Sequence, residues 1–278
     1  MYLIQETAIG GKEMKAYEII NVLGKYGTRK DYSKSCDTIK AGSPETEVNK
    51  VVVTMFPTVE LVRRAKEWGA QMIIVHEPTY YKHMDEHSDD KIECEKRAFI
   101  ESTGIVIYRF HDHPHVNKPD MIAAGGIRQL DLLCDVEYPE GRFGLARLTL
   151  QNPITPIELA KRIEEKFGIK HLRIAGNREK EITHISTLFG TPGGVLEELQ
   201  EENSEVILTG EIMEWALGEY VRDAAALGYR KTLLVMGHEG SEWAGMLYTA
   251  DLLKEACPEL EVVYMDCGEV YTYTDSEL

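Results

Sequence analysis

The sequence predicts an α/β protein of two lobes, each built on a mixed, largely parallel sheet. Short runs rich in β-branched residues alternate with longer amphipathic segments, which is the order that parallel strand connections require. The length of 278 residues is enough for two lobes around buried cores. Pro and Gly gather between residues 134 and 153, so we place the boundary near residue 140, between lobes 1–140 and 141–278.

The first half of the chain carries the pattern of the N-terminal lobe. Lys50–Phe56 is rich in β-branched residues, and Thr58 is a suitable N-cap for the helix that follows. Strands are expected at 50–56, 72–75 and 105–110, and helices at 12–25, 59–68, 91–103 and 119–133. Polar residues dominate 26–48 and 79–90, which are expected to be loops.

The second half repeats the alternation of strand and helix. Thr155-Pro156 is a good helix opening, because Pro at the first helical position gives up no hydrogen bond that the helix needs. Strands are expected at 143–150, 171–175, 181–189, 205–209, 231–237 and 261–266. Helices are expected at 155–167, 194–202, 212–227 and 242–256.

Acidic side chains outnumber basic ones, with 47 Asp and Glu against 31 Lys and Arg and a net charge of −16. Such a surface repels phosphate groups, which disfavours general nucleic-acid binding and binding to anionic membranes. No apolar run approaches the roughly 20 residues of a transmembrane helix. Met1–Glu6 also lacks a signal-peptide pattern. We therefore expect a cytoplasmic protein.

The cysteines are scattered through the chain and form no Cys-x-x-Cys pair. An odd, dispersed set predicts reduced thiols rather than a disulfide framework or a thiolate zinc site. We interpret them as small apolar residues of the core. The set is Cys36, Cys94, Cys134, Cys257 and Cys267.

Three histidines stand just beyond the carboxyl ends of predicted strands, each close to a carboxylate. His76 precedes Glu77, and His111 opens the run His-Asp-His-Pro-His. His238 stands four residues before Glu242. Ligands of open α/β sheets bind beyond the carboxyl ends of the strands. Their co-occurrence at equivalent strand ends favours a metal site, although each motif alone also fits a structural role.

The spacing within the motifs suggests how they would present ligands. Pro78 takes the chain out of the sheet, so the two residues before it could reach different ions. The three imidazoles of His111–His115 have a period of two and would share one face if the segment were extended. If Ser241 capped the next helix, Glu242 would enter the first turn, where its two oxygens could bridge two cations.

The remaining motifs carry weaker signals. His83 and His87 lie in an acidic stretch that we expect to be an exposed loop near the site, and we assign His171 and His184 structural roles. The Gly-rich turn Gly190–Gly194 fits either backbone amides that face an anion or a simple tight turn. Glu211, in Thr-Gly-Glu, fits either a functional carboxylate or a favourable charge at a helix start.

The order of these motifs resembles the Ngg-interacting factor three-like family, whose members are named GTP cyclohydrolase I type 2 homologues. The family pattern has a strand ending in His-His-Pro, a strand ending in His-x-x-x-Asp, a Gly-rich turn, Thr-Gly-Glu and Gly-His-x-x-x-Glu. The corresponding segments here are His76–Pro78, His111–His115, Gly190–Gly194, Thr209–Glu211 and Gly237–Glu242. The resemblance extends from about Asp37 to Met265 and implies two lobes facing a shared metal-binding cleft.

Carried over by position, the resemblance implies a ligand set of three His and two carboxylates: His76, Glu77, His115, His238 and Glu242. Glu77 stands where the family has its second His, and His115 stands where it has Asp, so the charge of the set is preserved. The register of 111–115 leaves His111 as a further candidate ligand, with Asp112 or His113 as alternatives. A third interpretation is that the two exchanges mark a site that binds no metal.

The resemblance implies a dinuclear centre of Zn, Mn, Fe or Co and a metal-dependent hydrolase acting on a small, nucleotide-like substrate through a metal-bridging hydroxide. His238 and Glu242 are the expected catalytic residues. It also implies a ring-shaped homo-oligomer, with a homohexamer as the candidate size. The alternative hypothesis is a non-catalytic metal-binding ring that acts as a scaffold or regulator.

Overall fold

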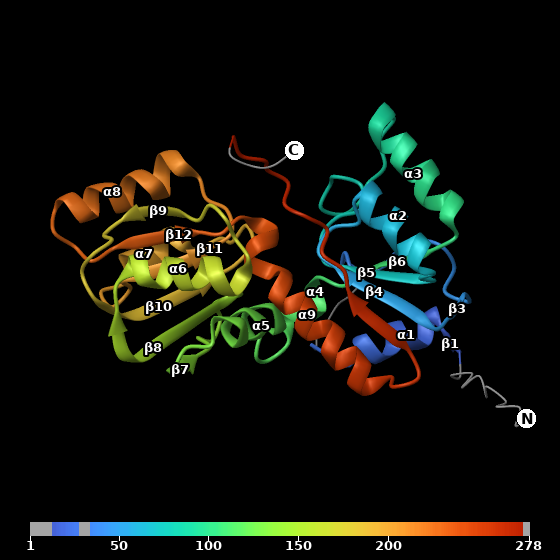
Figure 1. The fold of residues 1–278 in the computed structure, drawn as a ribbon, viewed down its shortest axis with the longest axis horizontal. Helices are drawn as coiled ribbons and strands as arrows, with labels where there is room; N and C mark the ends of the chain where they lie inside the picture. Colours follow the sequence, from blue (N-terminus) through green and yellow to red (C-terminus); the bar gives the residue numbers. More distant parts are fainter. Residues whose placement is uncertain (1–12, 28–33, 275–278) are drawn as a thin grey trace, which may run out of the picture.

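A computed structural model describes residues 13–27 and 34–274, and in this part of the chain two mixed sheets form two lobes (Figure 1). The sheets have five and six strands, and a two-stranded ribbon pairs β1 (Met14–Lys15) with β3 (Glu47–Val48). The predicted fold class is confirmed. The first six residues, in which we expected no signal peptide, lie outside the described ranges.

The five-stranded sheet has the order β13-β4-β5-β6-β2 and is parallel except for the edge strand β2. Its strands are β13 (Glu261–Tyr264), β4 (Lys50–Thr54), β5 (Met72–Val75), β6 (Val106–Arg109) and β2 (Ile39–Ala41). Helices α2 (Val59–Trp68) and α3 (Lys91–Thr103) cover one face, and α1 (Ala16–Leu23) packs on the other. Alternate strand residues face opposite sides, so Val51 and Val52 enter different clusters.

The six-stranded sheet has the order β7-β8-β10-β11-β12-β9, with parallel pairs at β10–β11 and β11–β12. Its strands are β7 (Cys134–Glu137), β8 (Leu145–Ile154), β10 (Ile182–Leu188), β11 (Val206–Thr209), β12 (Thr232–Val235) and β9 (Arg173–Gly176). Helix α6 (Pro156–Phe167) packs on one face. Helices α7 (Val195–Gln200) and α8 (Glu219–Ala226) pack on the other, and a π-helical turn, Glu214–Gly218, precedes α8.

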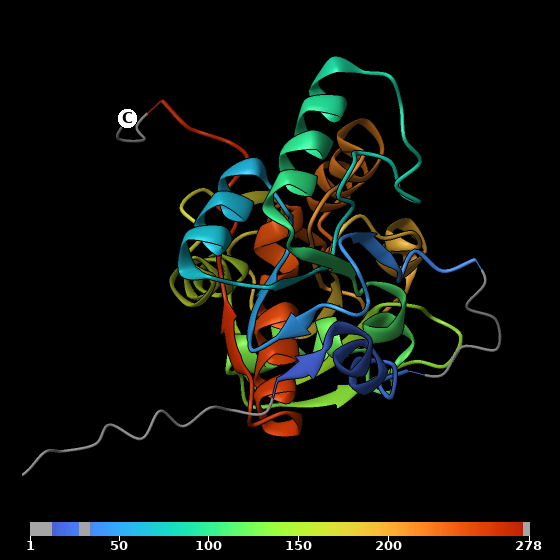
Figure 2. The same cartoon turned by 90° about the vertical axis from the view of Figure 1, so that its right-hand side faces the viewer.

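Helix α9 (His238–Ala256) leaves the six-stranded sheet after β12, crosses between the lobes and leads to β13 in the five-stranded sheet (Figures 1 and 2). It packs closely against α5 (Met121–Leu130): a Cβ added at Gly125 of α5 would stand only 2.6 Å from Ala244 O of α9. We expected 141–278 to form the second lobe, whereas the last strand of that range pairs with β4 in the first. The boundary near residue 140 itself stays a prediction.

Expectations for individual elements were wrong in several places. The helix expected at 12–25 begins only at Ala16, after β1, and the strand β7 was not expected. The polar segment 26–48, expected to be a loop, contains β2 and β3, because pairing with β6 and β1 stabilises strands that the polar sequence does not indicate. The helix expected at 242–256 begins four residues earlier, at His238, after a Gly237 with φ of 83°.

All five cysteines are free, as expected. Among the described residues, no helix combines the length and apolar character needed to cross a bilayer.

Candidate metal centre

His76 and Glu77 follow β5 at its carboxyl end, where both backbone amides donate to Met55 O, at 3.2 and 3.0 Å. The Nδ1–H of His76 donates to Phe110 O at 3.1 Å, which leaves the lone pair of Nε2 free. That Nε2 is buried and has no hydrogen-bond partner in the part of the chain that the structure describes. Burial holds the pKa of His76 well below its ordinary value. His76 is therefore a neutral imidazole whose lone pair is available to a metal.

The segment after β6 is a short helix, α4 (Asp112–Val116), so the condition of an extended run, under which all three imidazoles would share one face, is not met. Asp37 explains the difference, because its carboxylate accepts hydrogen bonds from the backbone N–H groups of residues 111, 112 and 113. In a helix, residues four apart share a face, so His111 and His115 point the same way. His113 turns instead to Asp37, with Nδ1 2.5 Å from Oδ2.

His238 is the first residue of α9 and Glu242 lies one turn further on, so both project from one helix face. Ser241, considered as a possible N-cap, lies within the first turn of α9, and Gly237 stands at the N-cap. The Ser241 hydroxyl donates to His238 O at 2.9 Å and accepts from Gly190 N at 2.9 Å. The serine therefore ties the start of α9 to the Gly-rich turn.

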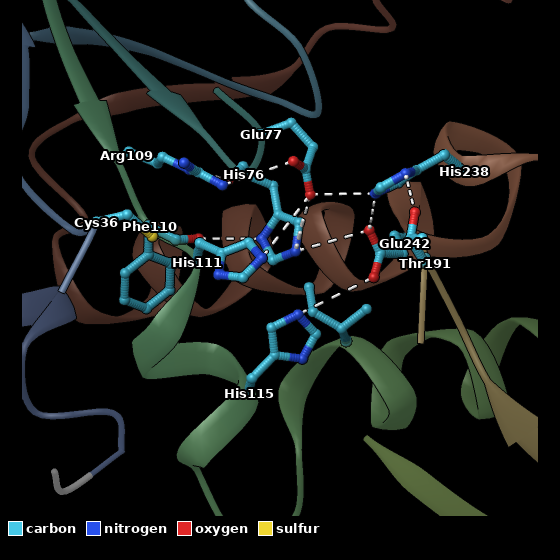
Figure 3. A network of polar contacts seen from close by, with 12 residues as sticks. Cys36, His76, Glu77, Arg109, Phe110, His111, His115, Thr191, His238 and Glu242 are labelled. Carbon is cyan, nitrogen blue, oxygen red and sulfur yellow. Dashed lines mark hydrogen bonds and ion pairs between the residues drawn. The ribbon is translucent and has the colours of Figure 1, made fainter. Parts of the chain in front are cut away.

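The three strand ends converge on one cluster, drawn in Figure 3. Glu77 Oε1 lies 3.1 Å from His238 Nε2 and 3.9 Å from His111 Nε2. Glu242 Oε2 lies 3.2 Å from His238 Nε2, and its other oxygen lies 4.0 Å from His115 Nε2. The structure thus brings together all six predicted ligands, His76, Glu77, His111, His115, His238 and Glu242.

Two overlapping groups within this cluster have ligand atoms close enough to hold an ion. His76 belongs to both: to one with His111 and His115, and to another with Glu77 and Glu242. In each group these atoms all lie within 4.8 Å of one another. Imidazole and carboxylate ligands together suit Zn, Mn, Fe or Co. The donor set fits a metal centre.

The four histidines of the cluster share one arrangement: Nδ1 is bound by an oxygen and Nε2 faces inward. His111 Nδ1 donates to Asp112 Oδ1 at 3.1 Å, and His115 Nδ1 donates to Asp120 Oδ2 at 3.0 Å. His238 Nδ1 lies 2.7 Å from Glu211 Oε1 and 3.1 Å from Thr191 Oγ1. Outer oxygens of this kind fix the tautomer and ring orientation of metal-binding histidines.

The electrostatics of the cluster favour positive charge at its centre. Burial opposes a charge on His238, but hydrogen bonds to Glu242 and Glu77 outweigh it and raise its pKa to about 11. Burial also opposes a charge on His115, but Asp120 and the two glutamates raise its pKa to about 9. Burial alone would raise the pKa of Glu77, whereas the bond from His238 and the nearby histidines hold it well below its ordinary value. The cluster therefore stabilises cations.

Two glycines of the motifs make room for this cluster. A Cβ at Gly190 would lie 2.5 Å from Glu242 Oε1, and its φ of +68° is one that other residues rarely adopt. A Cβ at Gly210 would lie 2.4 Å from Gly190 O. The Gly-rich turn is therefore a close-approach turn beside Glu242, and the carboxylate of Glu211 serves as the outer partner of His238.

The other histidines lie where the sequence indicated. His83 is exposed, with its ring 5.6 Å from that of His111, so it stands beside the cluster without entering the candidate groups. His87 is exposed beside Glu93. His171 packs on Tyr273, and His184 lies on β10 beside Glu205.

Sequence reasoning missed three residues that support the cluster: Asp37, Asp120 and Arg109. Asp120 had a visible signal, since an Asp before an apolar helix is a common N-cap, and its Oδ1 accepts from Ile122 N and Ala123 N. Arg109 ends a buried strand and is fully buried itself. Nothing local in the sequence marks Arg109 or Asp37, because their partners are distant along the chain.

The fold and the cluster define a class: a two-lobed α/β protein with a candidate metal centre where the strand ends of both lobes meet. The chain belongs to the Duf34/NIF3 (NGG1p interacting factor 3) family, whose family model matches residues 14–269. The resemblance drawn from the motifs is thereby confirmed.

Individual relatives are distant in sequence. A protein of Clostridium perfringens named GTP cyclohydrolase 1 type 2 homolog is 22% identical over 249 residues, covering 87% of this chain and 92% of that protein. The structure of a Bacillus cereus protein related to NIF3 superposes with a TM-score of 0.74 at 13% identity, covering 96% of this chain and 100% of that one. TTHA1606 from Thermus thermophilus gives a TM-score of 0.71 at 18% identity, covering 93% and 100%. These structural matches show a shared fold.

Proposed function

We propose that the protein is a metal-dependent hydrolase that holds two divalent ions and acts on a small, nucleotide-like substrate. One observation carries the proposal: four inward-facing imidazoles, each held at Nδ1 by an outer oxygen, meet two buried glutamates. Structural histidines rarely need such uniform orientation, whereas metal ligands do. The name of the Clostridium perfringens relative also points to nucleotide chemistry.

When bound, two divalent ions would supply Lewis acidity and would lower the pKa of a bound water to near neutrality. The chain's own residues would divide the remaining work. Glu242, buried at the centre, presents one oxygen toward His238 and the other toward His115, so it is suited to bridge two cations. His238, 22% exposed at its side chain, would hold an ion through Nε2, while Glu211 accepts the proton that Nδ1 carries.

Metal analysis of the purified protein tests the first half of the proposal. We expect up to two divalent ions per chain in the parent protein and a large loss in a His238→Ala, Glu242→Ala double variant. Since His184 and Glu205 form a similar pair on the six-stranded sheet, a His184→Ala, Glu205→Ala variant is the matched control. Equal metal content in the parent and the first double variant would overturn the site assignment.

Activity of the metal-loaded protein tests the second half. Nucleotide, phosphoester and amide substrates would be offered, with the His238→Ala, Glu242→Ala variant as the inactive reference. Turnover of any class by the parent alone supports a hydrolase. A metal-loaded parent that is inert on all classes favours the non-catalytic scaffold. The ring-shaped homo-oligomer stays a prediction, which sedimentation velocity would measure.

A further inference from the structure

Arg109 is the largest fully buried side chain among the described residues, at the end of β6 beside the candidate centre. A buried guanidinium is costly unless hydrogen bonds and an anion compensate it. Its Nε donates to His76 O at 2.9 Å, and its Nη1 donates to His83 O. These two carbonyls fix the plane and position of the guanidinium.

The remaining nitrogen of Arg109 points to Glu77. Nη2 lies 3.6 Å from Glu77 Oε2 and makes no hydrogen bond among the described residues. Asp85 is the other carboxylate within reach, with Oδ2 3.8 Å from Nη1. That oxygen lies closer to Lys40 Nζ, at 3.1 Å. Glu77 is therefore the anion left to compensate Arg109.

Glu77 divides its two oxygens between Arg109 and the cluster, as Figure 3 shows. Oε2 faces the guanidinium, while Oε1 lies 3.1 Å from His238 Nε2. A free carboxylate could rotate and offer both oxygens to a cation. With Oε2 facing the arginine, only Oε1 is turned toward the centre.

We propose that Arg109 is a positioning residue that holds Glu77 as a one-oxygen ligand of the metal centre. The inference rests on the proposed function, because it assigns Glu77 to metal. It predicts that Arg109 matters to metal binding only while a carboxylate stands at position 77. An imidazole at that position would have no second oxygen for the guanidinium to hold.

A double-mutant cycle between Glu77→His and Arg109→Gln tests this, with Co²⁺ as the probe, measured by visible absorption and equilibrium dialysis. Arg109→Gln is expected to weaken one Co²⁺ by about 10- to 100-fold, the usual loss when the outer partner of a ligand is removed. In the Glu77→His background, the same change should alter the Co²⁺ affinity by less than about threefold. The difference between the losses in the two backgrounds is the coupling expected of two residues in contact.

Arg147→Gln is the matched control, since Arg147 pairs with the buried Glu198 at 2.8 Å on the six-stranded sheet. It should leave Co²⁺ binding unchanged. Arg109→Lys is a second variant in case Arg109→Gln does not fold by circular dichroism. Arg109 contacts the two carbonyls and Glu77 from three separate nitrogens, whereas the N–H groups of an ammonium all leave one atom. Arg109→Lys should therefore also weaken Co²⁺ binding.

Equal losses from Arg109→Gln in both backgrounds, or no loss beside Glu77, would overturn the inference. If Glu77→His binds no Co²⁺, the crystal structure of Arg109→Lys decides: an unchanged Glu77 orientation overturns the inference, and a rotated carboxylate supports it. A parent protein without Co²⁺ binding would overturn the proposed function and this inference together. Two bound Co²⁺ with no coupling would overturn the inference alone.

Discussion

The carboxylate of Asp37 accepts a hydrogen bond from the backbone N–H of His111 at 2.8 Å and lies 2.5 Å from the ring of His113. One side chain thereby starts α4 and removes His113 from the candidate centre. His111 and His115 are left facing His76, with ring centroids at 4.6 and 5.0 Å. The geometry of the cluster depends on a residue outside it.

Replacing Asp37 by Ala should therefore weaken both the fold and metal binding. The loss of acceptors for buried N–H groups is expected to cost about 1–3 kcal/mol in urea unfolding. Metal content should fall, because α4 no longer holds two ligands in place. Asp90→Ala is the control, since Asp90 caps α3 in the same way. Equal metal content in the two variants would contradict the role of Asp37.

Gly190 should not tolerate even one added methyl group. In Gly190→Ala the new Cβ would lie 2.5 Å from Glu242 Oε1 and displace it. Gly141→Ala has a similar φ of +72° with nothing within 4 Å, so it carries the backbone strain without the clash. We expect both variants to lose about 1 kcal/mol of stability, and only Gly190→Ala to lose metal. Metal retained by Gly190→Ala would count against a ligand role for Glu242.

Glu211 should act on metal binding through His238. Glu211→Ala removes the acceptor 2.7 Å from His238 Nδ1, and an outer partner of this kind is typically worth about 10- to 100-fold in metal affinity. Glu214→Ala is the control, because Glu214 pairs with Arg173 at the surface. Isothermal titration calorimetry would measure the Zn²⁺ affinity of the two variants. Similar affinities in the two variants would leave Glu211 without this role.

Lys96 should make the free energy of unfolding depend on pH in the alkaline range. Burial lowers its pKa to about 8, from an ordinary 10.5. Between these values the folded chain has released the proton while the unfolded chain still holds it, so unfolding free energy rises with pH. Lys96→Met should be more stable than the parent by about 1–3 kcal/mol at pH 7.

That advantage should shrink as the pH approaches 10.5. Urea unfolding of both proteins at pH 7 and pH 10 would measure it. Lys91→Met is the control, because Lys91 lies at the surface with 88% of its side chain exposed. A difference between Lys96→Met and the parent that stays constant with pH would exclude this origin.

The sequence predicted the elements whose signals are local. The bounds of α2 were predicted correctly because Thr58 caps its start and Gly69, with φ of 88°, ends it. Strand β5 was equally clear, as a short apolar run followed by His76. The set of candidate ligands was also visible, because strand ends carry their own signature in an α/β fold.

Tertiary structure decided how those residues are presented. Helix α4 exists because Asp37, 74 residues before His111, meets its first N–H groups. Glu77 and His238 are 161 residues apart and meet because α9 carries the chain from one sheet to the other. Strand β13 joins the first sheet for the same reason. By itself the sequence determined the fold class and which residues gather at the strand ends. The orientation of each ligand required the folded chain, because hydrogen bonds between distant segments set it.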